Sequence, residues 1–119
     1  MCDCCLPHNH GGVFEHGGEN MPCTEDFSTV ADVFKKLDDP SRLKIFWLLC
    51  HCEECVINLS SLMEMSSPAV SHHLKVLRSA GLIVSRREGK EVYYKAADTA
   101  VCRTLHETIE KIMEISCPK

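Results

Sequence analysis

The stretch of sequence that decides the fold is SSPAVSHHLKVLRSAG, at residues 66–81. Its apolar residues Val70, Leu74 and Leu77 recur at helical spacing, and small, hydroxyl and basic side chains occupy the other face. VSRREGKEVYY follows at residues 84–94 and predicts a β-hairpin with a basic tip. A helix of this kind beside a basic hairpin is suited to entering a DNA groove while the hairpin contacts phosphate.

Working outward from this stretch, the apolar spacing predicts four more helices and places the hairpin between the last two. The other helices are expected at about residues 26–37, 40–50, 55–65 and 98–115, and the strands at 82–87 and 91–96. A mainly α (α+β) winged helix-turn-helix is therefore predicted. The last helix is long and apolar with little of the domain left to cover it, which is typical of a dimer interface.

The ends of the chain differ in composition, and this difference predicts the domain organisation. Residues 1–24 are rich in Cys, His and Gly and show no apolar period, which predicts a flexible arm. Residues 25–119 are expected to form the winged helix domain for DNA binding and dimerisation. A chain of 119 residues suffices for one domain with a modest core, so a homodimer is plausible.

Composition and charge exclude several classes of protein. No apolar run of about 18 residues exists, and Met1-Cys-Asp-Cys-Cys5 does not resemble a signal peptide, so a cytoplasmic protein without membrane contact is expected. The net charge of −4 argues against nucleic acid, but residues 66–95 carry six basic and two acidic side chains. This segment has a charge of +4 against −8 for the remainder, so a local basic face can still bind phosphate.

Three motifs together resemble the ArsR/SmtB family of bacterial metal-sensing repressors. They are DPSRLKI at residues 39–45, PAVSHHLKVLRSAGLI at 68–83 and RREGKEVYY at 86–94, in the order and spacing of that family. The resemblance covers roughly residues 28–115. It implies a homodimeric winged helix repressor that leaves its promoter when an effector binds, and the effector is usually a soft or borderline metal ion.

The resemblance and the helix pattern together indicate which residues would contact double-stranded DNA. The fourth helix of each subunit would enter a major groove, and the expected contacts are Ser67, Ser71, His72 and Lys75. The expected wing contacts to phosphate or the minor groove are Arg86, Arg87 and Lys90. His73 either packs locally or joins His72 at the DNA. A twofold dimer implies an inverted-repeat operator with half-sites about one helical turn apart.

Nine cysteines in a chain expected in the cytoplasm favour metal ligation or thiol chemistry over a disulfide framework. The family's metal motif, a Cys-Val-Cys-Asp-Leu-like run, is represented here only by its first cysteine, Cys55, because Ile57 and Asn58 occupy the later ligand positions. Further candidate thiols lie in the preceding turn and in the arm. The expected metal ligands are Cys55, Cys52 and Cys50 with Cys2, Cys4 and Cys5.

Thiolate ligands favour soft ions, so Cd(II), Pb(II), As(III) or Zn(II) is the expected effector. A site that joins Cys55 to the arm thiols is the leading hypothesis, since an ion there would tie the arm to the DNA-reading helices. A second metal site of the family lies on the last helix. This sequence keeps Asp98 at the first ligand position of that site, but the partner position holds Ala100 and the later pair falls at Lys111 and Glu114, so the site looks degraded. Cys102, His106 and Cys117 are weaker metal candidates on that helix, where Cys102 and His106 share a face.

Two alternatives remain open from the sequence. A thiol redox or persulfide-responsive repressor of the same fold would use cysteines at positions that hold Trp47 and Met113 here, although Cys50 or Cys52 could pair with Cys102 or Cys117. A metal buffer has only the Cys-rich arm in its favour. An enzyme is not expected, because no Cys-x-x-Cys opens a helix after a strand.

Overall fold

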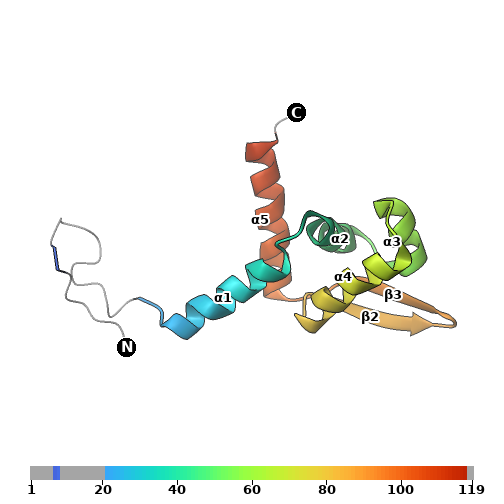
Figure 1. The fold of residues 1–119 in the computed structure, drawn as a ribbon, viewed down its shortest axis with the longest axis horizontal. Helices are drawn as coiled ribbons and strands as arrows, with labels where there is room; N and C mark the ends of the chain where they lie inside the picture. The colour runs from blue at the N-terminus through green and yellow to red at the C-terminus, as the bar shows by residue number, and fades with distance from the viewer. Residues whose placement is uncertain (1–6, 9–20, 118–119) are drawn as a thin grey trace. The chain divides into compact units, whose positions relative to one another are not determined.

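The computed structural model describes residues 7–8 and 21–117, and Figure 1 shows the order of their helices and strands. The elements are α1 (Thr24–Lys36), α2 (Pro40–His51), β1 (Glu54–Cys55), α3 (Val56–Met63), α4 (Ser67–Ser79), β2 (Ile83–Glu88), β3 (Glu91–Ala96) and α5 (Ala100–Ser116). The chain divides into two compact units between Lys35 and Lys36. The predicted mainly α winged helix-turn-helix is confirmed, with α3 and α4 as its two helices and β2–β3 as its wing.

The helix α4 begins and ends at the residues that its sequence predicts. The Ser66 hydroxyl accepts a hydrogen bond from the Ala69 amide at 3.3 Å, and Pro68 occupies the first turn. Gly81 follows the helix with a φ of +76°, a conformation that suits glycine. The apolar face of the helix is buried, as predicted, through Val70, Leu74 and Leu77.

The sheet contains one strand that the sequence did not predict. The two predicted strands pair antiparallel, and Gly89 at the hairpin tip has a φ of +64°. β1 adds to the outer edge of β3 and gives the strand order β1-β3-β2. Its pairs are Glu54 with Tyr94 and Cys55 with Tyr93. A strand of two residues is too short to show an alternating pattern, so the sequence carries no signal for it.

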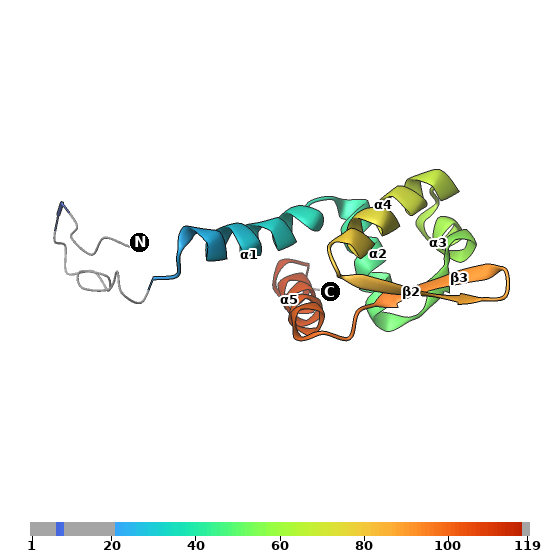
Figure 2. The same cartoon turned by 90° about the horizontal axis from the view of Figure 1, so that it is seen from below.

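The helix α2 lies at the centre of the second unit, between α5 and the α3–α4 pair in both views (Figures 1 and 2). The Asp39 carboxylate caps it by accepting from the Arg42 amide at 3.0 Å. Ile45, Phe46 and Leu49 are its buried side chains. Since α2 packs against α4 and α5, it connects the expected DNA-reading helix to the expected dimer helix.

Among the described residues, three helices, α1, α3 and α5, carry large apolar side chains that remain exposed. No residue of α1 is buried, and Phe27, Val30 and Phe34 are each more than half exposed. The C-terminal part of α5 exposes Ile112 and Ile115. In the part of the chain that the structure describes, none of the helices has both the length and the apolar character that crossing a membrane requires.

Candidate nucleic-acid interface and metal-ligand clusters

The outward face of α4 carries a stripe of polar and basic side chains. Ser67, Ser71, Lys75 and Arg78 follow one another at steps of four, four and three residues, and all are exposed. These steps place them on one side of the helix, away from its buried apolar residues. Arg78 was not among the predicted contacts, although its position three residues after Lys75 places it in the same stripe.

A groove runs between this stripe and the wing. It has a volume of about 450 Å³, and its lining includes Ser71, Lys75, Arg78 and the β3 residue Tyr94. With Ser79, which also lines it, two cationic side chains and three hydroxyl groups border the space between helix and hairpin. Such groups donate hydrogen bonds to phosphate oxygens, which is the common mode of contact to a nucleic-acid backbone.

The neighbouring histidines of α4 have different surroundings. The His73 side chain is only 12% exposed, accepts from Arg42 Nε at Nδ1 over 3.3 Å, and lies 4.0 Å from the Asp39 carboxylate. Burial lowers the pKa of His73 although Asp39 opposes this shift, so the ring stays neutral and suited to accept from Arg42. His72 is exposed. Only His72 therefore lies where an external ligand can reach it.

The basic residues of the wing are not equivalent. The Arg86 guanidinium donates to both oxygens of Glu53, at 2.9 and 2.8 Å, and to Glu88 at 2.6 Å, and it lies 4.9 Å from the centre of the Tyr93 ring. In the structure it fastens the wing to the turn before β1, because its planar guanidinium group fits a carboxylate. The expected contact of Arg86 with DNA stays a prediction. Arg87 and Lys90 are exposed on the hairpin.

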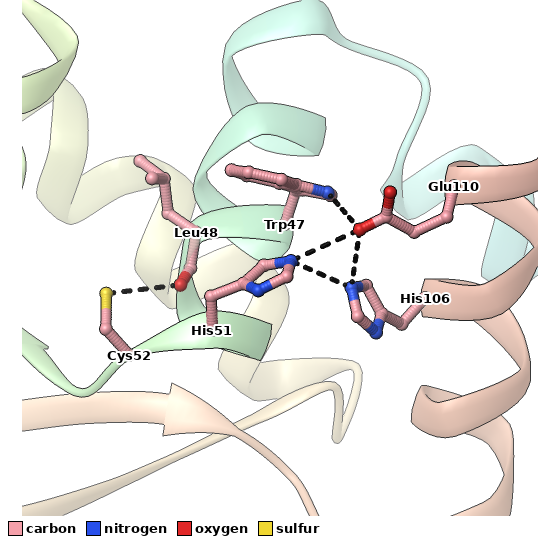
Figure 3. Close-up of polar contacts among 6 residues, drawn as sticks. All are labelled: Trp47, Leu48, His51, Cys52, His106 and Glu110. Atoms are coloured by element: carbon pink, nitrogen blue, oxygen red, sulfur yellow. Dashed lines mark hydrogen bonds and ion pairs between the residues drawn. The ribbon is translucent and has the colours of Figure 1, made fainter. Parts of the chain in front are cut away.

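The three thiols near the end of α2 do not converge as the sequence predicted. Cys50 is half-buried on α2, Cys52 is exposed and donates to the Leu48 carbonyl at 3.3 Å (Figure 3), and Cys55 is buried in β1. They do not form a three-ligand group, because the helix holds the first and the sheet holds the last. Cys2, Cys4 and Cys5 lie outside the described residues, so the arm-to-helix site stays a prediction.

Burial also affects the acidity of these thiols. It raises the pKa of Cys50 to about 11, with smaller contributions from Cys102 and Glu110. Burial and then the Glu54 carboxylate raise the pKa of Cys52. Both thiols therefore hold their protons at neutral pH, and a metal ion has to displace those protons to bind.

The weaker candidates on α5 are also separated. Cys102 is buried and its thiol donates to the Leu82 carbonyl at 3.3 Å, whereas Cys117 is exposed beyond the end of the helix. Cys102 and His106 line one groove with Cys50 and Cys52, but the His106 ring turns toward other partners. The structure therefore does not assemble a site from Cys102, His106 and Cys117.

The partners of His106 are His51, the last residue of α2, and Glu110, one turn further along α5 (Figure 3). Within residues 7–8 and 21–117, these three form the only group of three potential ligand atoms that lie within 4.8 Å of one another. Hydrogen bonds from Trp47 Nε1, the largest cause, and from the two rings lower the pKa of Glu110. His106 and Glu110 are four residues apart, a spacing that marks a shared helical face, whereas His51 gave no signal of its own.

The comparisons with known proteins agree on one family. A family model described as "Bacterial regulatory protein, arsR family" matches residues 39–85, which include α2, α3, α4 and the start of β2. A "Transcriptional repressor SmtB homolog" of Synechocystis is 41% identical over 85 residues, 71% of this chain and 64% of that protein. A "Cadmium resistance transcriptional regulatory protein CadC homolog" of Staphylococcus aureus is 42% identical over 73 residues, 60% of each chain.

These two matches span less than two thirds of the relatives' length, but a third match is more extensive. The "HTH-type transcriptional regulator NmtR" of Mycobacterium tuberculosis is 37% identical over 100 residues, which are 79% of this chain and 83% of that protein. Among solved structures, the "homodimeric winged helix-turn-helix DNA-binding domain" Mb0332 of Mycobacterium bovis is similar with a TM-score of 0.69 and 32% identity. That likeness covers 77% of this chain and 85% of the solved chain.

Proposed function

The chain belongs to the ArsR family of bacterial regulatory proteins, whose members are DNA-binding transcriptional regulators and not enzymes, and from this premise we propose that it is a metal-responsive repressor. Two copies bind an inverted-repeat operator and leave it when a thiophilic ion binds. Cytoplasm, where the DNA lies, is the compartment in which it acts.

The observation that carries this proposal is the exposed stripe of α4 beside the wing. Ser71, Lys75 and Arg78 face the groove toward Tyr94, so a phosphate backbone can lie against cations and hydroxyl groups together. Ser67 extends the exposed surface toward the start of the helix, which is the end that enters the major groove in helix-turn-helix proteins, and His72 is exposed next to Ser71. Arg87 and Lys90 give the wing its contacts, while Arg86 positions the wing through Glu53.

The proposal of a homodimer has support from the uncovered apolar side chains and from the homodimeric relative Mb0332. Val101, Ile112 and Ile115 of α5 are each more than half exposed. An apolar stripe of this size on a helix is energetically unfavourable in water and is covered when two copies associate. A twofold dimer presents two copies of α4, which fits an operator with two half-sites.

The effector site of this proposal contains Cys55 and thiols of the N-terminal arm, with Cd(II), Pb(II), Zn(II) or As(III) as the ion. The name of the CadC relative, a cadmium resistance regulatory protein, supports a metal effector in general. Cys55 pairs with Tyr93 of the wing and immediately precedes α3, which packs on α4. An ion that pulls on Cys55 therefore acts on the wing and on the reading helices at the same time.

A thiol-responsive repressor of the same fold is the second candidate. Cys50 and Cys102 line the same groove, and their charges would influence each other. The high pKa of Cys50 opposes this candidate, because a reactive sensor thiol needs a large thiolate fraction near neutral pH.

The experiment is a titration of the reduced, full-length protein on a fluorescent inverted-repeat operator with each of the four ions. DNA release is followed by anisotropy and metal binding by thiolate-to-metal ultraviolet absorption. We expect release in step with the absorption band, and we expect Cys55→Ser to bind the operator but to resist release. Lys75→Ala should weaken operator binding and lower the salt dependence by about one counterion, whereas Lys111→Ala on α5 should not.

Release by oxidants or persulfides in place of metal ions would overturn the metal proposal and favour the thiol candidate. Tight metal binding with the DNA complex intact would contradict the metal proposal, would point to metal buffering or a structural metal, and would favour the thiol candidate.

A further inference from the structure

We propose that His51, His106 and Glu110 of a single chain form a binding site for a borderline divalent metal ion such as Zn(II), separate from the thiol site at Cys55. The site joins the end of α2 to the middle of α5 (Figure 3). His51 and His106 are 55 residues apart in the sequence, so the packing of these two helices creates the cluster.

The three ligand atoms already form a triangle of the size that a metal ion requires. His51 Nε2 and His106 Nε2 are 3.0 Å apart, and they lie 3.2 Å and 3.1 Å from the same Glu110 oxygen, Oε1. Tetrahedral Zn(II) with ligands at about 2.0–2.1 Å has ligand atoms about 3.3 Å apart. An ion can therefore bind on this triangle after movements of only a few tenths of an ångström.

Hydrogen bonds cannot satisfy all three edges of the triangle. Each Nε2 carries at most one hydrogen in the plane of its ring. If both rings donate to Glu110, the N–H groups of His51 and His106 face each other across 3.0 Å. If only one Nε2 carries a hydrogen, that hydrogen serves one edge of the triangle, and the lone pairs of two ligand atoms face each other along another edge. A metal ion accepts a lone pair from each of the three atoms and removes this conflict.

Trp47 supports the carboxylate from outside the triangle. Its Nε1 donates to Glu110 Oε1 at 3.0 Å. The Glu110 oxygen has two lone pairs, which is too few to accept hydrogen bonds from Trp47, His51 and His106 together. One hydrogen bond from Trp47 and one bond to a metal ion would use both lone pairs. Hydrogen bonds of this kind orient metal-binding carboxylates in known sites.

The exposure and donor types indicate the class of ion. The side chains of His51, Glu110 and His106 are 44%, 43% and 28% exposed, so an ion reaches them from solvent and keeps a position for water. Two imidazoles and one carboxylate suit Zn(II), Co(II) or Ni(II), whereas the softer ions expected at Cys55 prefer thiolate. The triangle therefore favours borderline ions over the soft ions Cd(II), Pb(II) and As(III), whereas Zn(II) suits both sites.

Trp47 provides a local probe, because it is the single tryptophan of the chain. The reduced, full-length protein is titrated with Co(II) and with Zn(II) while Trp47 emission is recorded. Thiolate-to-Co(II) absorption is measured in the same samples and reports the cysteine sites. We expect quenching by Co(II) that saturates at one ion per chain, and displacement of Co(II) by Zn(II).

Glu110→Gln and Glu107→Gln are matched variants, since each removes one carboxylate from α5 and only the first lies in the triangle. Glu110→Gln should weaken the Co(II) response of Trp47 by at least about tenfold, Glu107→Gln should leave it unchanged, and the thiolate band should persist in both. His106→Gln, checked by circular dichroism, gives the same test if Glu110→Gln folds poorly.

Equal Co(II) affinities for Glu110→Gln and Glu107→Gln would overturn the proposal, as would Trp47 emission that saturating Co(II) leaves unchanged. Neither result depends on operator release by thiophilic ions, so the two proposals fail separately.

Discussion

Two basic residues of the wing, Arg86 and Lys90, differ in what surrounds them. Arg86 is engaged by Glu53, Glu88 and the Tyr93 ring. Lys90 follows the tip glycine and is exposed. A charge that already has two carboxylate partners attracts phosphate less than an unneutralised one. At the scale of single residues, charge and position in the hairpin thus do not reveal which basic side chains already have carboxylate partners.

The acidity of Cys50 gives a prediction at the same scale. Burial raises its pKa to about 11, so its thiolate fraction at pH 8 is roughly a hundredfold below that of an unperturbed thiol. Since alkylation requires the thiolate, we expect Cys50 to react with iodoacetamide far more slowly than exposed Cys117 at pH 8. Its rate should rise with pH until about pH 11.

Mass spectrometry of the labelled peptides measures both rates in one sample, with Cys117 as the internal control. Equal labelling of Cys50 and Cys117 at pH 8 would contradict the prediction and would restore Cys50 as a candidate redox thiol.

At the scale of elements, the short strand β1 connects the start of α3 to the wing, two parts of the molecule that are far apart in the sequence. It lies directly before α3 and pairs with β3 of the wing. Glu53, the residue just before β1, accepts a hydrogen bond from Arg86 of β2. The turn after α2 is thus fixed to the wing by backbone pairing and by an ion pair. If an ion binds at Cys55 as proposed, this connection would carry its effect directly to the wing and to α3.

The start of α4 gives a prediction at the element scale. Ser66→Ala removes the hydroxyl that accepts from the Ala69 amide, and loss of such a cap costs about 1 kcal/mol of unfolding free energy. Ser61→Ala is the control, because Ser61 is exposed inside α3 and away from any helix start. Urea unfolding at equal protein concentration compares the two, since the stability of a dimer depends on concentration. Equal losses in both variants would show that the cap does not stabilise α4.

At the scale of the whole molecule, the apolar side chains that one chain leaves exposed indicate how copies associate. Ile112 is 55% exposed on α5, with Val101 and Ile115 on the same helix. Burial of such side chains contributes about 25 cal/mol for each Å² removed from water. A charge placed among them should therefore oppose association strongly.

We expect Ile112→Asp to shift the protein from dimer to monomer at micromolar concentration and to weaken operator binding with it. Ile57→Asp is the control, because Ile57 is 66% exposed but lies on α3. Sedimentation velocity measures the mass of each variant. A dimeric Ile112→Asp protein, or a monomeric Ile57→Asp protein, would argue against α5 as the interface.

The sequence by itself determined the helices, the hairpin and the polar stripe of α4. Their signals are local: apolar spacing around Leu74, a cap at Ser66 and a glycine at the hairpin tip act within a few residues. Tertiary structure alone decided the pairing of β1, the capture of Arg86 by Glu53, the separation of Cys50 from Cys55 and the meeting of His51 with His106. Each of these features depends on how different helices and strands pack against one another. The spacing of apolar residues within a single helix or strand carries no information about that packing.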